Sequence, residues 1–302
     1  MSVQRRQGEN VPERTTQGAD EARDTLPEDL RDRLDRFRAT AAERGLPSEN
    51  VERWLRTARR SAMLYPEADG PVAGRFGGPL MLPPGMPVPG TSDPEDPVAH
   101  QLIATIDLAA IPEGATGLPL PSDGHLLLFA VPELALEVEL AGSAVHLPAG
   151  TPVEERRQDL DYEPYEYDSP EDLDEDLRGR GELRLACAVS LPLHSGYHDL
   201  HFRSDLARAW DEAAAEIRPT GHVPLQIGGN AADHEGWGDP VRGSAAGLED
   251  GDGAPDAPGP EDWVLLAQWE GLPMATVYWT MPRQDLAELR FDRVLVQMYA
   301  NP

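Results

Sequence analysis

The sequence contains no lysine: all 26 of its basic residues are arginine. This absence excludes mechanisms that depend on a lysine amine, such as Schiff-base chemistry and the lysine that holds ATP phosphates in phosphate-loop enzymes and kinases. Alanine, glycine and proline are abundant beside the arginine, which is typical of proteins encoded by GC-rich genomes. Part of the bias is therefore attributed to nucleotide composition rather than to function.

The chain has a single cysteine and no long hydrophobic run. Cys187 cannot form an internal disulfide, paired-cysteine zinc sites are impossible, and apolar neighbours predict a buried, unreactive thiol in a strand. The first 25 residues lack the apolar stretch of a signal peptide, and no run approaches the ~18 apolar residues of a membrane helix. We expect a cytoplasmic protein without a membrane partner.

Positive charge is scarce relative to negative charge. The chain has 54 acidic and 26 basic residues, a formal net charge of −28. A field of this sign repels nucleic acids and anionic membranes, so neither is an expected partner. It suits a basic protein partner or a cation, and it also keeps a protein soluble. No cofactor is expected, because no phosphate-loop, dinucleotide-loop or Gly-x-Ser-x-Gly motif occurs.

The amino-terminal part of the chain is predicted to be a disordered tail followed by a helical hairpin. Residues 1–26 mix charge, glutamine, glycine and proline without hydrophobic periodicity, which is typical of disorder. Within residues 27–61, one helix is expected to begin near Pro27 and end at Gly45. A second begins at Ser48, a good capping residue. Both carry an apolar stripe with which the hairpin can pack on the main domain.

From residue 62 to residue 302, short apolar runs alternate with proline and glycine, which predicts a β-rich domain. Two helices are expected within it, over residues 204–217 and 283–289. The clearest strands are expected over residues 102–108, 124–131, 182–191, 263–269, 275–281 and 294–299.

Two segments of this domain are predicted to be insertions. Residues 153–177 are crowded with Asp and Glu, opposed only by Arg156 and Arg157, so self-repulsion predicts an extended, solvated and mobile segment. Residues 243–260, rich in glycine, alanine, proline and aspartate, are predicted to be a linker. Three tyrosines of the acidic segment are candidates to anchor it to the body or to a partner: Tyr162, Tyr165 and Tyr167.

Two stretches of the domain follow the same pattern. Phe76-Gly77-Gly78 precedes an apolar strand that ends in Asp107, and Ile227-Gly228-Gly229 precedes one that ends in Glu270; in each case a second apolar strand follows. The recurrence predicts an internal duplication in which a Gly pair, through positive φ or close backbone approach, turns the chain into a strand of each half. The expected fold class is α+β, with a β-rich core built from two similar halves.

The arrangement resembles the YwqG-like family, a bacterial domain family of unknown function. The resemblance rests on residues 75–85 (RFGGPLMLPPG), 106–108 (IDL), 226–229 (QIGG) and 265–269 (LLAQW), and it extends from residue 62 to the end. It implies a β-rich α+β fold of two similar halves and brings no known activity. We expect the halves to present a groove near the Gly pairs, where the binding residues are Gly77, Gly78, Gly228, Gly229, Gln268 and Trp269.

The chain departs from the family pattern at two positions. Leu225 stands where the family tends to have a histidine just before the second Gly pair, and Thr105 stands where it tends to have a glutamine in the first strand. If those polar residues line a shared site, this chain has lost or altered it.

Three histidines lie close together after the strand at residues 182–191. His194, His198 and His201 have the spacing of three and four residues that can place imidazoles on one helical face. Pro192 and Gly196 argue against a regular helix there, and spacing without a helix fixes no geometry. Exposed or hydrogen-bonded histidines are therefore favoured over a metal site.

Residues 234–239 are the most chemically suggestive segment outside the strands. His234 lies beside Glu235 and close to Asp239, and an imidazole beside carboxylates can perform acid–base chemistry if a pocket holds them. No residue is identified as a nucleophile, so a polar surface turn is favoured over a catalytic site.

These features favour a non-enzymatic binding or protein-interaction module, of an immunity or regulatory type, with a basic protein as partner. The alternative is a hydrolase or metal-dependent enzyme that uses the clustered histidines and carboxylates. Convergence of those side chains in one concave pocket would favour the enzyme, whereas scattering over the surface would favour the binding module.

We predict that no tightly held transition metal copurifies with the protein, because the histidine cluster has no scaffold that fixes its geometry. Elemental analysis of protein purified without an affinity tag measures this. A stoichiometric metal that is lost when His194, His198 and His201 are replaced would contradict the prediction and support the enzyme.

Overall fold

The structure is a computed structural model. It describes residues 28–91, 98–133, 139–140, 142–192, 200–214, 225–232, 238–249 and 258–300. The predicted disordered tail, residues 1–26, lies outside this part of the chain.

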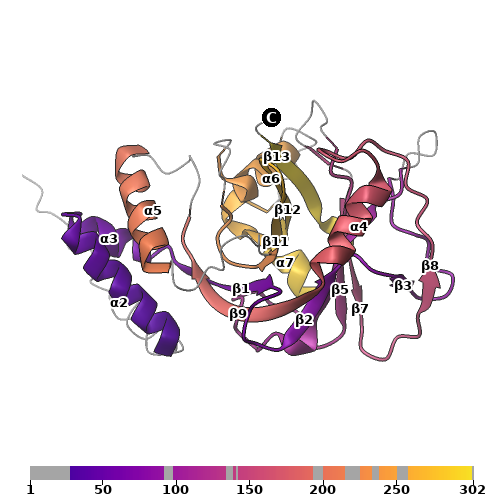
Figure 1. The fold of residues 1–302 in the computed structure, drawn as a ribbon, viewed down its shortest axis with the longest axis horizontal. Helices are drawn as coiled ribbons and strands as arrows, with labels where there is room; N and C mark the ends of the chain where they lie inside the picture. The colour runs from indigo at the N-terminus through magenta and orange to yellow at the C-terminus, as the bar shows by residue number, and fades with distance from the viewer. Residues whose placement is uncertain are drawn as a thin grey trace, which may run out of the picture.

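Three helices form a small module beside the main domain (Figure 1). α2 (Glu28–Glu43) and α3 (Ser48–Leu55) are the predicted helix pair, which is confirmed, and α5 (Leu200–Ala214) joins them from the middle of the chain. The three share one apolar cluster, whose centre is an edge-on contact of the Phe37 ring with a tryptophan of α3 and another of α5. The module is therefore assembled from two distant parts of the chain.

The sequence predicted the end of α2 correctly, but it did not predict the residue at which α3 is capped. Gly45 follows α2 with φ +72°, and its N–H donates to the carbonyl of Ala42, as expected of a helix-ending glycine. Ser48, predicted to cap the second helix, is instead its first residue. Pro47 occupies the capping position, and no side chain caps this helix. The proline fixes an extended backbone at that point and sets where the helix begins.

One antiparallel sheet of eleven strands dominates the domain, with the order β6-β13-β12-β11-β10-β1-β9-β2-β4-β5-β7. Its strands are β1 (Arg59–Tyr65), β2 (Val72–Phe76), β4 (Gln101–Asp107), β5 (His125–Ala130), β6 (Glu139–Leu140), β7 (Gly142–Leu147), β9 (Glu182–Ser190), β10 (Leu225–Ile227), β11 (Trp263–Leu272), β12 (Ala275–Pro282) and β13 (Leu295–Ala300). The helix pair and this sheet make an α+β fold.

The sheet is nearly closed. β6 and β7 are almost consecutive in sequence, yet β6 pairs with β13 at one edge and β7 pairs with β5 at the other. Gly142 of β7 also lies against Val296 of β13, so closely that a Cβ at residue 142 would be 2.6 Å from a methyl of the valine. The missing side chain at Gly142 therefore allows the two edges to meet.

Apolar side chains fill the inside of the closed sheet. They include the fully buried Trp269 and Trp279, and the indole N–H of Trp279 crosses the interior to donate to the Phe129 carbonyl at 2.9 Å. The helix α4 (Pro170–Arg180) adds Leu173 and Leu177 to the same core. The interior is thus a packed core.

Shorter elements cover the outside of the sheet. A two-stranded sheet of β3 (Leu80–Leu82) and β8 (Glu154–Arg156) contributes to an apolar cluster against β4 and β5. The helix α6 (Pro240–Glu249) lies over β11 to β13. The remaining elements are α7 (Arg283–Ala287), which the sequence predicted, and the 3-10 turns η1 (Leu108–Ala110), η2 (Pro260–Asp262) and η3 (Phe291–Arg293).

The six predicted strands and the helices over residues 204–217 and 283–289 are confirmed, with shifted ends. Several strands were not predicted, for physical reasons that differ. β1 starts at Arg59, inside the segment assigned to the helical hairpin, and its RRSAMLY sequence shows little alternation. β10 has three residues and β6 has two. Strands of this kind are specified by their neighbours in the sheet rather than by their own pattern.

The prediction of an extended, solvated segment over residues 153–177 is wrong. The segment, called the acidic strap below, contains β8 and most of α4. Ser169 caps α4 by accepting from the Asp172 N–H at 3.2 Å, and Leu173 and Leu177 are fully buried. The apolar stripe and the cap outweigh the repulsion between exposed carboxylates, which water screens.

The prediction of a linker over residues 243–260 is wrong for its first part. Residues 243–249 belong to α6, and Ser244 and Ala245 are buried against the sheet. The small residues that suggested a linker serve here to bring a helix close to the sheet. Residues 250–257 lie outside the described part of the chain.

The strand order is similar on the two sides of the central pair β1·β9. One side runs β2-β4-β5-β7 and the other β10-β11-β12-β13, each with antiparallel neighbours. β1 precedes β2 in the chain but pairs with β10, whereas β9 precedes β10 but pairs with β2. The two central strands have therefore exchanged partners. β1 pairs with the side whose strands follow β9 in the chain, and β9 pairs with the side whose strands follow β1.

The two Gly pairs occupy corresponding places in this order. Gly77 follows β2 and donates to the Ile103 carbonyl of β4 at 2.8 Å; Gly228 follows β10 and donates to the Leu266 carbonyl of β11 at 3.1 Å. All four glycines have positive φ, from +51° to +93°. A bulge follows in each pairing, between Leu102 and Ala104 and between residues 265 and 267.

Three glycine variants should separate backbone strain from steric conflict. Gly229→Ala should lower the free energy of unfolding by more than about 2 kcal/mol, because φ is +83° and the new Cβ would lie 2.3 Å from Ser190 Oγ. Gly150→Ala, with φ +77° and open surroundings, should cost about 1 kcal/mol. Gly179→Ala, in open space within α4, should raise the free energy of unfolding by up to about 1 kcal/mol, because alanine favours a helix more than glycine does. Urea denaturation measures all three, and equal losses at residues 229 and 150 would contradict the close packing.

Candidate functional site

The second Gly pair is held by a buried network of side-chain amides. Gln226 donates from Nε2 to the carbonyls of Gly228 and Asn230, both at 2.8 Å. Asn230 in turn donates from Nδ2 to the carbonyl of Thr57, at the end of the helical module, at 2.9 Å, while its N–H donates to Ser190 Oγ at 2.7 Å. The network thus joins the helical module to the sheet and fixes the turn after β10.

Gln268, a predicted binding residue, belongs to the same region and is only 1% exposed. Its Oε1 accepts from the Ala232 N–H at 2.9 Å, and its Nε2 donates to Glu270 Oε1 at 2.6 Å. Both hydrogen-bonding ends of the amide are occupied by the protein itself. The structure therefore places Gln268 as a support for the segment that follows the Gly pair.

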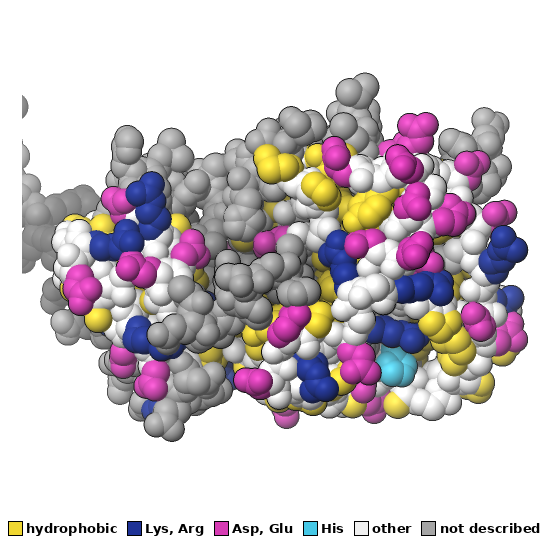
Figure 2. Space-filling view, in the orientation of Figure 1, with side chains coloured by type: hydrophobic (Ala, Val, Ile, Leu, Met, Phe, Trp, Pro, Cys, Tyr) yellow, Lys and Arg dark blue, Asp and Glu magenta, His cyan; other side chains and the backbone are white. Residues whose placement is uncertain are grey.

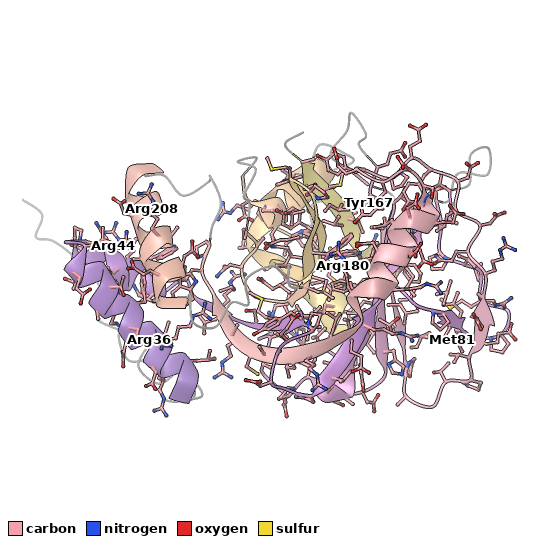
Figure 3. All side chains as sticks on the ribbon, in the orientation of Figure 1. Arg36, Arg44, Met81, Tyr167, Arg180 and Arg208 are labelled. Atoms are coloured by element: carbon pink, nitrogen blue, oxygen red, sulfur yellow. The ribbon has the colours of Figure 1, made fainter. Side chains whose placement is uncertain are left out.

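Trp269 faces the opposite side of β11 and is fully buried in the core. The Arg180 guanidinium, at the end of α4, lies 5.6 Å from the Trp269 ring centre and 5.8 Å from that of Phe76. Arg180 also donates to the Gly271 carbonyl at 2.8 Å and pairs with Asp176 at 2.7 Å. Figure 3 shows Arg180 on α4, in front of the sheet. The contacts of Arg180 with Trp269 and Gly271 therefore hold the end of α4 against the large sheet.

The first Gly pair lies under the same helix. A Cβ at Gly77 would be 3.1 Å from the Leu177 Cβ, and one at Gly78 would be 2.9 Å from the Arg75 guanidinium carbon. These glycines therefore allow close approach of α4 and of a neighbouring side chain. Their surroundings assign them a role in packing.

The predicted catalytic and metal-binding residues lie mostly outside the described part of the chain. This holds for His194, His198, His234 and Glu235, and for the side chain of His201 in α5. Asp239 is described: its Oδ1 accepts from the Val241 N–H at 3.0 Å at the start of α6. Its carboxylate thus serves as a helix cap. Among the described residues, no three His, Cys, Asp or Glu side chains are grouped to hold a metal ion.

A buried histidine that the sequence did not single out lies at the start of β4. His100 is 5% exposed, its Nδ1 lies 3.0 Å from Ser143 Oγ of β7, and its Nε2 is buried without a partner in the structure. An unpaired lone pair costs less than an unpaired N–H, so we assign the proton to Nδ1 as the donor to Ser143. Burial lowers the pKa of His100 to about 4.

Two side chains of the acidic strap bind the backbone and side chains next to His100. Gln158 donates to the His100 carbonyl at 2.5 Å and accepts from the Leu102 N–H at 3.2 Å, as a neighbouring strand would. Tyr162 donates to Gln101 Oε1, and burial raises the pKa of its phenol, which keeps this donor protonated. The strap is therefore held to the body by hydrogen bonds at the start of β4.

All three tyrosines of the strap contact the body of the protein. Besides Tyr162, Tyr165 is buried in the main core, and Tyr167 packs against that core. The Tyr167 hydroxyl also donates to Asp176 Oδ2, within the strap, at 2.9 Å. The first alternative from the sequence, anchoring to the body, is thus confirmed. Figure 3 labels Tyr167, in the strap, and Arg180, at the end of α4.

The anchored strap presents an acidic surface. Acidic side chains are numerous around α4 in Figure 2. Arg178 pairs with Asp174, Arg180 with Asp176 and Arg156 with Glu154. Asp174 and Asp176 are half-buried, whereas ten other carboxylates of the strap are exposed. The exposed acids are Glu154, Glu155, Asp159, Asp161, Glu163, Glu166, Asp168, Glu171, Asp172 and Glu175.

Comparison of the chain with protein-family models gave no match, and comparison with curated proteins gave none either. Within the described residues, no helix combines the length and the apolar character needed to cross a membrane.

Acid should destabilise the protein through His100. Above pH 6.5 the imidazole is neutral in both the folded and unfolded states. Between pH 6.5 and about 4 only the unfolded state takes up the proton, so the free energy of unfolding falls as pH falls. After allowance for solvent screening, the loss should be on the order of 1 to 2 kcal/mol.

The measurement is urea denaturation at pH 7 and pH 4.5 for three proteins. His100→Gln should lose less stability over this interval than the unaltered protein, whereas His125→Gln, at an exposed position, should behave as the unaltered protein does. An identical loss in the unaltered protein and His100→Gln would show that His100 does not carry this pH dependence.

Proposed function

We propose that the protein is a non-enzymatic interaction module that binds a basic protein partner through the acidic strap. The observation that carries this proposal is the set of ten exposed carboxylates on a segment with only two arginines before α4 reaches Arg178. Such a surface attracts cationic groups and speeds their encounter. An immunity or regulatory role is consistent with a surface that acts by binding alone.

The anchoring of the strap supports the same function. Its own Tyr165, Leu173 and Leu177 are buried in the main core, and its Gln158 and Tyr162 form hydrogen bonds at the start of β4. A segment that is ordered before a partner arrives loses less conformational entropy on binding than a flexible acidic tail. The carboxylates therefore act as a preorganised surface.

We further infer that the core consists of two copies of one unit and that the chain is related to the YwqG-like family. The support is the corresponding placement of the Gly pairs and of the bulges that follow them. Matched side chains also share environments: Leu128 and Trp279, each opposite the alanine that follows the bulge, both lie in the main core. An experimentally determined structure of this chain, superposed side on side, would test the duplication.

Neutralising part of the strap should weaken binding of a cationic probe. The variant combines Asp159→Asn, Asp161→Asn, Glu163→Gln and Asp168→Asn, all at exposed positions. Affinity for a fluorescent nona-arginine peptide at low ionic strength should fall about tenfold, because four attractive charges are removed from one surface. Fluorescence anisotropy measures the affinity.

The matched control removes the same number of charges elsewhere. It combines Asp32→Asn, Glu43→Gln, Asp262→Asn and Asp292→Asn, which are exposed and lie outside the strap. This control should retain most of the affinity. An equal loss in both variants would mean that net charge alone attracts the peptide, and the strap would then not be the binding surface.

A further inference from the structure

The outer faces of the two sides of the sheet differ in polarity at corresponding positions. Strand register relates each position to its counterpart, with Leu102 and Leu265 preceding the two bulges. Under β3, the first side presents leucines and Phe129 in an apolar cluster. Under α6, the second side presents Tyr278 where the first has Leu127, and Thr280 where the first has Phe129.

One side-chain hydrogen bond joins α6 to this second face, a second lies within α6, and a third lies next to the helix. Thr280 donates to Ser244 Oγ at 2.6 Å, and Ser244 donates to the Pro240 carbonyl at 3.0 Å. Next to α6 in sequence, the Ala232 carbonyl accepts from the Tyr278 hydroxyl at 2.7 Å. Water can replace the bond between Thr280 and Ser244 when α6 and the sheet separate, whereas the apolar contacts under β3 have no such replacement.

The side chains of α6 that the structure describes, residues 240–246, make a small apolar contribution. Val241 and Ala245 are its members of the apolar cluster below it, and a Cβ at Gly243 would lie 2.7 Å from the Tyr299 hydroxyl. The helix contains two glycines among ten residues, and glycine inside a helix lowers its stability. By comparison, α4 inserts two leucines into the main core.

One buried polar group beneath α6 would gain a hydrogen bond to water if α6 separated from the sheet. Gln297 of β13 is 5% exposed, and its Oε1 is buried without a hydrogen-bond partner in the structure. A buried acceptor without a donor is unfavourable, and exposure to water would satisfy it. While α6 lies on the sheet, Gln297 Oε1 therefore lacks a hydrogen bond. When α6 moves away, water can donate one.

We propose that α6 is a reversible cover, which detaches from β11, β12 and β13 while the sheet stays folded. Detachment exposes a face with the hydroxyls of Tyr278 and Thr280 and the amide of Gln297. The cover over the first side, β3, lies on an apolar face and does not open in this way. The proposal concerns the motion of α6 and is independent of binding at the acidic strap.

Hydrogen exchange of the full-length protein tests the motion directly. Amides of α6 should exchange at least tenfold faster than those of β12 and β13, and their rates should not respond to low concentrations of urea, as local openings behave. Amides of β3 should instead exchange through global unfolding. If α6 exchanges only with β12 and β13, in one common unfolding event, the proposal is overturned.

Thiol labelling of a matched pair gives a second readout. In a Cys187→Ser background, Thr280→Cys and Phe129→Cys place thiols at corresponding, fully buried positions under α6 and β3. Residue 280 should react at least tenfold faster under native conditions. Phe129→Cys leaves a larger cavity than Thr280→Cys does, and a cavity eases access of the reagent to residue 129. This difference works against the expected result. Equal rates would overturn the proposal, and Leu127→Cys replaces Phe129→Cys if the latter fails to fold.

Discussion

The central pair of antiparallel strands, β1 and β9, is the contact on which the remainder of the sheet depends. Seven residue pairs join them, from Arg59 with Ser190 to Tyr65 with Arg184. β10 pairs with β1 and β2 pairs with β9, so every other strand of the large sheet is attached to one side or the other of this pair. Loss of the central pair would leave two unclosed sheets with exposed edges.

The exchange of partners between the two central strands makes the sheet a single structural unit. β1 completes the side formed by residues 225–300, and β9 completes the side that begins at β2. Side chains must be small where the strands meet the second Gly pair: Ser61 and Ser190 lie beside Gly229. The pairings join residues far apart in sequence, so the chain must close long loops before the core can form.

The candidate binding surface depends on this core although none of its carboxylates is part of it. The strap bends from β8 into α4, whose leucines lie in the main core and whose Arg180 stacks on Phe76 and Trp269. Apolar anchors beneath the carboxylates hold them in place. The acidic segment thus covers part of the main core and carries the surface proposed for cationic partners.

The sequence by itself determined the acidity, the helix pair, six strands and the positive-φ glycines, because each depends on composition or on local steric limits. Only the tertiary structure decided that the acidic strap is anchored, that Gln268 and Trp269 are buried, and that His100 meets Ser143. Those outcomes come from partners distant in sequence: 43 residues separate His100 from Ser143, and 91 separate Arg180 from Gly271. A local pattern cannot encode such a partner, because the energy of the contact exists only once the sheet has closed.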